Sequence, residues 1–200
     1  MSNELVRRCN WANSSADYSE YHDTEWGKPI REDRALYERL VLEGFQSGLS
    51  WITVLRKREN FRNAFLDFEV ERVANFSEKK VQKLLQDEGI IRHRGKIDAA
   101  IKNAQALISM WGSHGEGWLT KTLLEVAPSE KSLRSQGFTR PPTQLQDLPS
   151  KCNETEQLSK MLKGLGFGFV GPTTLYAALQ ATGFVNDHVT ECDFYSQNSD

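Results

Sequence analysis

The chain has 200 residues, with 38% hydrophobic residues, 26% charged residues and a formal net charge of −2. This composition predicts a folded, soluble protein with a single domain over residues 1–200, and the charge gives no overall signal for nucleic-acid binding. No apolar run approaches a membrane span, and the N-terminus lacks the apolar core of a signal peptide. We therefore expect a cytoplasmic protein that does not enter membranes.

The segment 9–27 is polar in composition but rich in aromatic side chains. Its aromatic residues are Trp11, Tyr18, Tyr21 and Trp26. Aromatic rings usually belong to a hydrophobic core, and that explanation suffices for any single one of them. Four rings around a possible metal ligand, His22, also fit a stacking pocket, and the sequence leaves both interpretations open.

Residues 34–48 have the spacing of an amphipathic helix. Glu43 follows Leu40 by three residues and Leu36 by seven, which places its carboxylate on the flank of the apolar face. A buried and unpaired charge there would be unfavourable. Glu43 is therefore either a rim residue whose head reaches water or a buried acid that awaits a cationic or hydrogen-bond-donating ligand. Trp51 follows close to the end of this helix.

Two further segments have helical periodicity. Residues 77–89 offer Ser77 as an N-cap, a short apolar face, and Gly89 just past the helix end. Residues 96–111 carry apolar side chains at i, i+4, i+7, i+11 and i+14, which form a single stripe. Alternating strand patterns are absent, so the predicted fold class is all-α.

The segment 112–156 breaks this helical pattern, because it is rich in Gly, Ser, Pro and polar residues. We expect it to cover the helical body as an irregular excursion. The alternative is a boundary between two helical subdomains.

Two clusters of basic residues are candidates for phosphate contacts, "RKRENFR" at 56–62 and "RHRGK" at 92–96. Such clusters are usually solvated faces. The second one directly precedes the helix that starts near Lys96, and backbone N–H groups at a helix start favour phosphate.

Residues 158–188 predict a helix, a glycine-punctuated hairpin and a second helix that Pro172 opens. Gly166, Gly168 and Gly171 allow tight turns and expose backbone amides. This pattern resembles the helix-hairpin-helix motif of the DNA glycosylase superfamily, which grips the DNA backbone without reading its sequence.

Two Cys/His pairs lie near opposite ends of the chain, Cys9 with His22 and His188 with Cys192. On a helix, His188 and Cys192 would lie one turn apart on the same face. A Cys₂His₂ zinc site has no open position, so such a site would be structural. Spacing alone leaves open whether these are four ligands or four unrelated residues. Cys152 has no partner in this pattern and is interpreted as a thiol.

Several longer motifs narrow the resemblance. They are "RCNW", "YHDTEWG", "LEGFQSGLSWITVLRKRENFR", "GIIRHRGKI" and "GFVNDHVTEC". With these motifs in this order, the chain resembles the 3-methyladenine DNA glycosylase I family. The resemblance covers residues 8–95 and 158–192 and is weak across 112–156.

The resemblance implies an all-α, helix-hairpin-helix glycosylase fold with one structural Zn²⁺ ion per chain, which joins the N- and C-terminal segments. The implied zinc ligands are Cys9, His22, His188 and Cys192. The implied catalytic residue is Glu43. The implied base-binding residues are Trp11, Tyr18, Tyr21 and Trp51. The implied DNA-binding residues are Gly48 and Leu49, which would face the gap left in the DNA, and Gly168 and Gly171 of the hairpin.

The implied reaction flips N3-methyladenine out of double-stranded alkylated DNA and excises it by hydrolysis, so that 3-methyladenine is the product. Asn186 stands where the superfamily usually has a catalytic aspartate, with Asp187 beside it. Thr173 stands where members that also cleave the DNA backbone have a lysine. We therefore expect a monofunctional enzyme without a lyase step, acting as a monomer.

Two other classes of function share part of this pattern. A DNA-binding module without enzymatic activity would also have the hairpin and the basic clusters, but it would need no carboxylate beside an aromatic pocket. A zinc hydrolase would need an open coordination position, which a set of four protein ligands does not provide.

Overall fold

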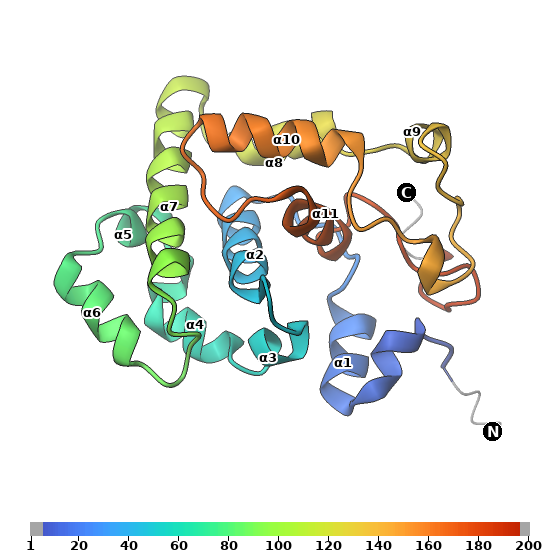
Figure 1. Ribbon diagram of the computed structural model, residues 1–200, viewed down its shortest axis with the longest axis horizontal. Coiled ribbons are helices and arrows are strands. Elements are labelled where there is room, and N and C mark those ends of the chain that lie inside the picture. Colours follow the sequence, from blue (N-terminus) through green and yellow to red (C-terminus); the bar gives the residue numbers. More distant parts are fainter. Residues whose placement is uncertain (1–5, 197–200) are drawn as a thin grey trace.

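Helix α2 (Asp33–Gln46) lies at the centre of the fold, between α7 (Arg94–His114) on one side and α11 (Pro172–Ala181) on the other (Figure 1). The computed structural model describes residues 6–196. Within that range the secondary structure is entirely helical and contains no strand, which confirms the predicted all-α class. None of its helices is both long and apolar enough to span a bilayer.

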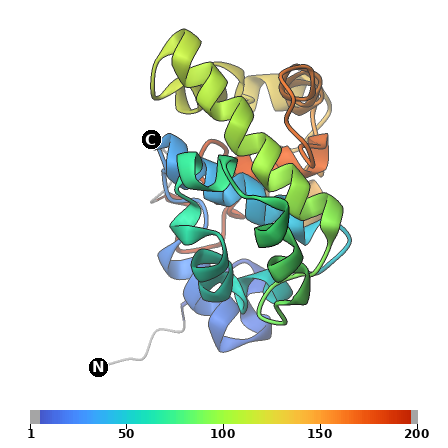
Figure 2. The ribbon, with the colours of Figure 1, turned by 90° about the vertical axis from the view of Figure 1, so that its left-hand side faces the viewer.

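The remaining helices surround this centre. Before and after α2 in the chain come α1 (Ala16–Thr24), α3 (Trp51–Leu55), α4 (Arg58–Ala64), α5 (Val70–Ala74) and α6 (Glu78–Gln86). Later come α8 (Trp118–Val126), α9 (Glu130–Ser135) and α10 (Asn153–Gly164). Three short 3₁₀ segments are Asn10–Ser14, Leu66–Phe68 and Leu145–Asp147. Helix α7 crosses most of the molecule, with α5 and α6 on one side (Figure 2).

Local sequence signals explain where several helices begin. The Ser77 hydroxyl accepts a hydrogen bond from the Lys80 amide at the start of α6, as the sequence predicted. The His93 ring performs the same role for α7 through the Lys96 amide. Pro172 occupies the first turn of α11, where its missing N–H is harmless.

The segment 112–156 is more ordered than predicted. It contains α8 and α9 and the start of α10, and only the stretches between them are irregular. The start of α8 is held by Asp33 of α2, whose carboxylate accepts hydrogen bonds from the amides of Leu119 and Thr120. Because this cap comes from a distant part of the chain, no local sequence pattern predicts the start of α8.

One continuous hydrophobic core joins α2 with the helices from α3 to α11. A second, smaller cluster brings the two ends of the chain together. It consists of Cys9, Tyr21, Trp26, Ala181 and Cys192. Helix α1 and the C-terminal segment accordingly lie side by side (Figure 1). The candidate site forms where these two clusters meet.

Candidate functional site

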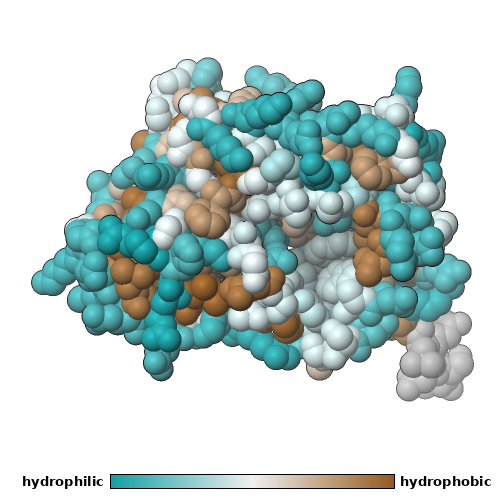
Figure 3. Space-filling view, in the orientation of Figure 1, coloured by the Kyte–Doolittle hydropathy of each residue, from teal (hydrophilic) through white to brown (hydrophobic). Residues whose placement is uncertain are grey.

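A cavity of about 400 Å³ opens between α1, α2, α3, α11 and the segment 145–150. It is visible as a hollow in the space-filling view (Figure 3). The residues that line it are Trp11, Tyr18, Tyr21, Trp26, Glu43, Gln46, Trp51, Leu145, Leu148, Pro149, Ser150, Ala177 and Gln180. Its volume falls within the range of about 300–1,000 Å³ that is typical of small-molecule sites.

The cavity brings together all four predicted base-binding residues with Glu43. Trp11 meets Tyr18 edge-on, with ring centroids 5.5 Å apart, and Tyr21 lies 5.6 Å from Trp51. The Tyr18 hydroxyl also accepts a hydrogen bond from the Ile52 amide at 3.0 Å, which ties α1 to the start of α3. These aromatic side chains therefore form the walls of a pocket. Membership of a hydrophobic core alone does not explain their arrangement.

Glu43 is the carboxylate in this aromatic pocket, and only 5% of its surface is exposed. Burial raises the pKa of Glu43 to about 7, while the nearby Arg39 guanidinium acts to lower it. Of the two interpretations that the sequence left open, the structure supports the buried acid. A buried carboxylate with an open cavity before it can accept hydrogen bonds from a cationic ligand.

Arg39 lies behind the pocket, one helical turn before Glu43, and was not identified from the sequence. Its guanidinium donates a hydrogen bond to the Tyr21 hydroxyl at 2.9 Å and lies 3.8 Å from Oε1 of Glu43. It also stacks over the Trp51 ring, 5.0 Å from the ring centroid. The i, i+4 spacing of a positive and a negative residue was the signal that would have found it.

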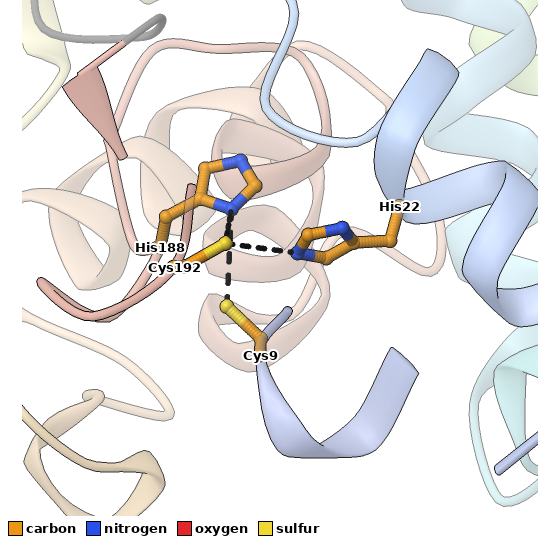
Figure 4. Close-up of side chains that lie close together, drawn as sticks. All are labelled: Cys9, His22, His188 and Cys192. Atoms are coloured by element: carbon orange, nitrogen blue, oxygen red, sulfur yellow. Dashed lines mark hydrogen bonds between the residues drawn. The ribbon is translucent and has the colours of Figure 1, made fainter. Parts of the chain in front are cut away.

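Next to this pocket, Cys9, His22, His188 and Cys192 converge (Figure 4). All four side chains are buried, and one ligand atom from each lies within 4.8 Å of the others. Sγ of Cys192 is 3.6 Å from Nε2 of His22 and 3.5 Å from Nδ1 of His188. The cluster could therefore hold a metal ion.

The segment that carries His188 and Cys192 is not helical, so the helical spacing considered for this pair does not apply. Residues 186–189 have no regular secondary structure and a turn follows at 190–192, which brings the two side chains together. Around the cluster, His22 Nδ1 is hydrogen-bonded to Asp23 at 2.9 Å, and Arg8 in turn holds the Asp23 carboxylate. Such an outer carboxylate fixes the orientation of a ligating imidazole.

The loop after α2 presents Gly48 and Leu49 to the surface beside the cavity. Gly48 has a φ of +81°, a conformation that favours glycine. The side chain of Leu49 is 42% exposed. The loop is anchored from behind by Lys96, whose ammonium group donates to the carbonyls of Phe45 and Ser47 at 2.9 and 2.6 Å.

A profile of the methyladenine glycosylase family matches residues 11–196. The chain belongs to this family. It is 44% identical to DNA-3-methyladenine glycosylase 1 of Escherichia coli, over 96% of this chain and 99% of that protein. It is 38% identical to the DNA-3-methyladenine glycosylase of Haemophilus influenzae, over 94% of this chain and 97% of that protein.

Solved structures of methyladenine glycosylases have the same fold. A crystal structure of a 3-methyladenine DNA glycosylase I superimposes with a TM-score of 0.84 at 43% identity and covers 94% of this chain and 98% of that one. The Staphylococcus aureus 3-methyladenine DNA glycosylase I, solved to explain 3-methyladenine recognition, gives a TM-score of 0.82 at 31% identity, over 93% and 95% of the two chains.

The connection between α10 and α11 (165–171), where the sequence predicted a hairpin, is fastened to α7. The amide of Gly168 donates to Oδ1 of Asn103 at 2.7 Å, and its carbonyl accepts from the same side chain at 3.1 Å. A Cβ at this position would lie 3.0 Å from Cβ of Ala99. The glycine therefore permits close packing of hairpin and helix, and its own amide is already bound. Gly171 immediately precedes α11.

In this glycosylase most basic side chains of the two clusters that the sequence offered as candidates for phosphate contacts are paired with carboxylates. In the first cluster, Arg56 pairs with Asp17 and Arg62 pairs with Glu38. Further contacts of the two clusters are Arg58 with Glu25, Arg62 with Glu59, Lys57 with the Glu88 carbonyl, Arg92 with Glu88, and Arg94 with Glu78 and Asp98. The acidic partners neutralise the clusters, and most of them come from other helices.

Asp187 is not positioned as a catalytic acid in this glycosylase. Its carboxylate is fully buried, pairs with Arg140, and accepts a hydrogen bond from Gln180 at 2.6 Å. Gln180 also lines the cavity. Sequence reasoning did not identify Gln180 or the 145–150 wall as parts of the site. Both reach the site through the tertiary fold, with no local motif to mark them.

Proposed function

We propose that this chain is a DNA repair glycosylase that excises N3-methyladenine from alkylated double-stranded DNA. The observation that carries the proposal is the buried Glu43 carboxylate inside a cavity with aromatic walls. A solved relative with a TM-score of 0.82 was crystallised in complex with 3-methyladenine. A cationic, planar purine needs both stacking surfaces and a negative hydrogen-bond acceptor, and this cavity offers the two together.

The excision reaction does not require a strong general acid. N3-methyladenine in DNA carries a formal positive charge, so breakage of its bond to deoxyribose releases a neutral base. The C1′–N9 bond breaks, the sugar passes through an oxocarbenium-like state, and a water molecule adds to C1′ and loses a proton. Asn186 stands at the position where related glycosylases usually have a catalytic aspartate, and a leaving group that is already activated does not need that acid.

Binding of the flipped base is the main task of the site. Flipping costs a few kcal/mol, roughly offset by stacking at about 1–3 kcal/mol per base. Trp11, Tyr18, Tyr21 and Trp51 provide the stacking surfaces and walls. Glu43 accepts hydrogen bonds from the adenine edge and complements its positive charge.

We further propose that hydrolysis is the only reaction. A lyase step needs an amine nucleophile, and no lysine lines the cavity among residues 6–196. Thr173, at the start of α11, stands at the position where a lysine would be expected in a bifunctional enzyme.

The DNA-contacting elements of the proposal are the exposed loop with Gly48 and Leu49 and the hairpin with Gly168 and Gly171. Leu49 has the exposure and the apolar character to enter the space that the flipped nucleotide leaves. The hairpin contacts the sugar-phosphate backbone close to the start of α11, whose free amides favour phosphate.

We propose that Cys9, His22, His188 and Cys192 hold one structural zinc ion. In a tetrahedral site with ligands about 2.0–2.3 Å from the metal, neighbouring ligand atoms lie roughly 3.3–3.8 Å apart. The distances of Cys192 Sγ to the two imidazoles, 3.6 and 3.5 Å, and of Cys9 Sγ to His188, 3.8 Å, fit this geometry. When bound, the ion would cross-link the chain ends beside the pocket, and four protein ligands leave no position for substrate.

The proposal also includes a single-domain, cytoplasmic monomer. One hydrophobic core runs from α2 to α11, which supports a single domain. None of the three cysteines, all within the described residues 6–196, forms a disulfide, and cysteines without disulfides are usual in a reducing compartment.

Chromatography of bases released from methylated duplex DNA tests the proposal, combined with zinc analysis of the same sample. We expect 3-methyladenine in the released fraction, about one zinc per chain, and no protein–DNA adduct after borohydride reduction. DNA binding without base release would indicate a DNA-binding module without enzymatic activity. A reduced adduct would overturn the monofunctional mechanism.

A further inference from the structure

Arg39 is a buried cation that touches the pocket without lining it. Its residue surface is only 6% exposed, and it lies on the central helix α2. Its guanidinium reaches three pocket residues from behind, namely Tyr21 through a hydrogen bond, Trp51 through ring stacking, and Glu43 through charge. Such a residue can shape the pocket although no ligand in the cavity would contact it.

This arrangement is unusual because a buried charge is expensive unless its partners compensate for it. The distance of 3.8 Å to Glu43 is longer than a hydrogen bond, so the pair is not a closed salt bridge. The Glu43 carboxylate therefore keeps acceptor capacity toward the cavity. Arg39 compensates the charge of Glu43 without occupying its oxygens.

We propose that Arg39 is a positioning residue for base excision, which favours the ionised form of the Glu43 carboxylate in the empty pocket and holds the Tyr21 and Trp51 rings in place. This inference rests on the proposed function as far as it concerns excision. It concerns Glu43 itself, however, and can be tested on the free protein.

The charged groups that face Glu43 define the expected pH dependence. Arg39, on the same helix as Glu43, acts to lower the pKa of Glu43. The effect of burial is larger and raises this pKa to about 7. From α1 comes Tyr21, whose hydroxyl is bound to Arg39, and directly after α1 lies Glu25, which is paired with Arg58 of α4 and acts on Arg39. Without the Arg39 charge, nothing opposes the effect of burial on the pKa of Glu43. The Glu43 carboxyl group will therefore stay protonated to higher pH.

The direct experiment follows the Glu43 carboxyl carbon by NMR in the full-length protein, with Glu43→Gln to assign its resonance. The variants are Arg39→Met, which removes the charge and keeps the apolar stem, Arg39→Gln, which keeps a hydrogen-bond donor, and Arg39→Lys, which keeps the charge. Arg34→Met is the matched control, because Arg34 is an exposed arginine on the same helix.

We expect the Glu43 midpoint to rise by about one pH unit or more in Arg39→Met and Arg39→Gln, and to stay near the native value in Arg39→Lys and Arg34→Met. If Arg39→Met fails to fold, the comparison of Arg39→Gln with Arg39→Lys decides the same question. An unchanged midpoint in the uncharged variants would overturn the assignment.

Single-turnover excision over the same pH range provides the second readout. In Arg39→Met the rise of the rate with pH will move upward together with the Glu43 midpoint, and Arg39→Lys will restore it. A loss of equal size at every pH would mean that Arg39 is only structural. If the native protein releases no 3-methyladenine at all, the proposed function fails, whereas the NMR titration still decides the role of Arg39.

Discussion

The Sγ atom of Cys192 lies 3.6 Å from Nε2 of His22, although 170 positions separate these residues in the chain. The contact fastens the C-terminal segment to α1, which also carries Tyr18 and Tyr21 of the pocket. The position of these two walls therefore depends on the Cys/His cluster. A metal there would act on base binding through the fold, without touching the base.

Replacement of Cys192 by Ser should reduce stability before it affects chemistry. Loss of one ligand from a structural zinc site should lower the free energy of unfolding by roughly 3 kcal/mol, or about 6–12 °C in the thermal midpoint for a chain of this size. Calorimetry and zinc analysis measure both effects. Cys152→Ser is the control, because Cys152 is a buried thiol outside the cluster. A folded, fully zinc-loaded but inactive Cys192→Ser would argue for a catalytic metal.

Replacement of Glu43 by Gln should abolish most excision while the protein stays folded. The amide cannot complement a cationic base, and loss of one such electrostatic group typically reduces a rate about 100-fold or more. The rate of single-turnover excision and the affinity for undamaged duplex DNA should be measured together. We expect the excision rate to fall and the affinity to stay unchanged. Glu38→Gln is the control on the same helix, since Glu38 pairs with Arg62 and does not line the cavity. Equal losses of excision and DNA affinity would make Glu43 structural.

Leu49 offers a separate test of base flipping. Leu49→Ala removes the exposed apolar side chain of the loop, and we expect excision from duplex DNA to fall roughly tenfold, with binding of free 3-methyladenine unchanged. Fluorescence of a base analogue at the lesion would report the flipped state. Leu124→Ala, at a side chain that is 55% exposed on α8, controls for general loss of surface apolarity. Unaltered flipping would remove Leu49 from the proposed DNA interface.

Helices with local signals could be predicted from the sequence, and helices without them could not. The structure places α6 at Glu78–Gln86 and α7 at Arg94–His114, close to the expected 77–89 and 96–111. Their apolar periodicity and their capping side chains lie within the helix or directly before it. In contrast, α8 begins where Asp33 caps it from 85 positions away, and the sequence around it predicted an irregular segment.

The same distinction holds for the site. The aromatic residues and Glu43 could be proposed from sequence because they crowd one segment and one helix face. The 145–150 wall and Gln180 could not, because only the tertiary fold brings them to the cavity. The pairing of the basic clusters could not be predicted for the same reason, since partners such as Glu25, which neutralises Arg58, lie far away in the chain.

Asp33 should determine part of the acid stability of the fold. Its carboxylate accepts hydrogen bonds from Trp111 Nε1 at 2.6 Å, from the amides of Leu119 and Thr120 at 3.0 and 2.8 Å, and from the Thr120 hydroxyl at 2.7 Å. Burial acts to raise the pKa of Asp33, but these hydrogen bonds outweigh it, and the pKa is lowered. An amide cannot satisfy these donors, because its NH₂ group would face one or more of them.

We therefore expect Asp33→Asn to lower the free energy of unfolding at neutral pH by about 2–3 kcal/mol, the size of an unsatisfied buried group. Because the folded-state pKa is depressed, the native contribution is complete above the unfolded pKa of about 3.9 and is lost as the pH falls through the folded value. The difference between native protein and variant should hence shrink in urea titrations below about pH 4. Asp98→Asn, at a half-buried carboxylate paired with Arg94, should stay within about 0.5 kcal/mol of the native protein. If the difference in the free energy of unfolding between native protein and Asp33→Asn stays constant down to low pH, hydrogen-bond geometry alone, without the Asp33 charge, stabilises the α2–α8 contact.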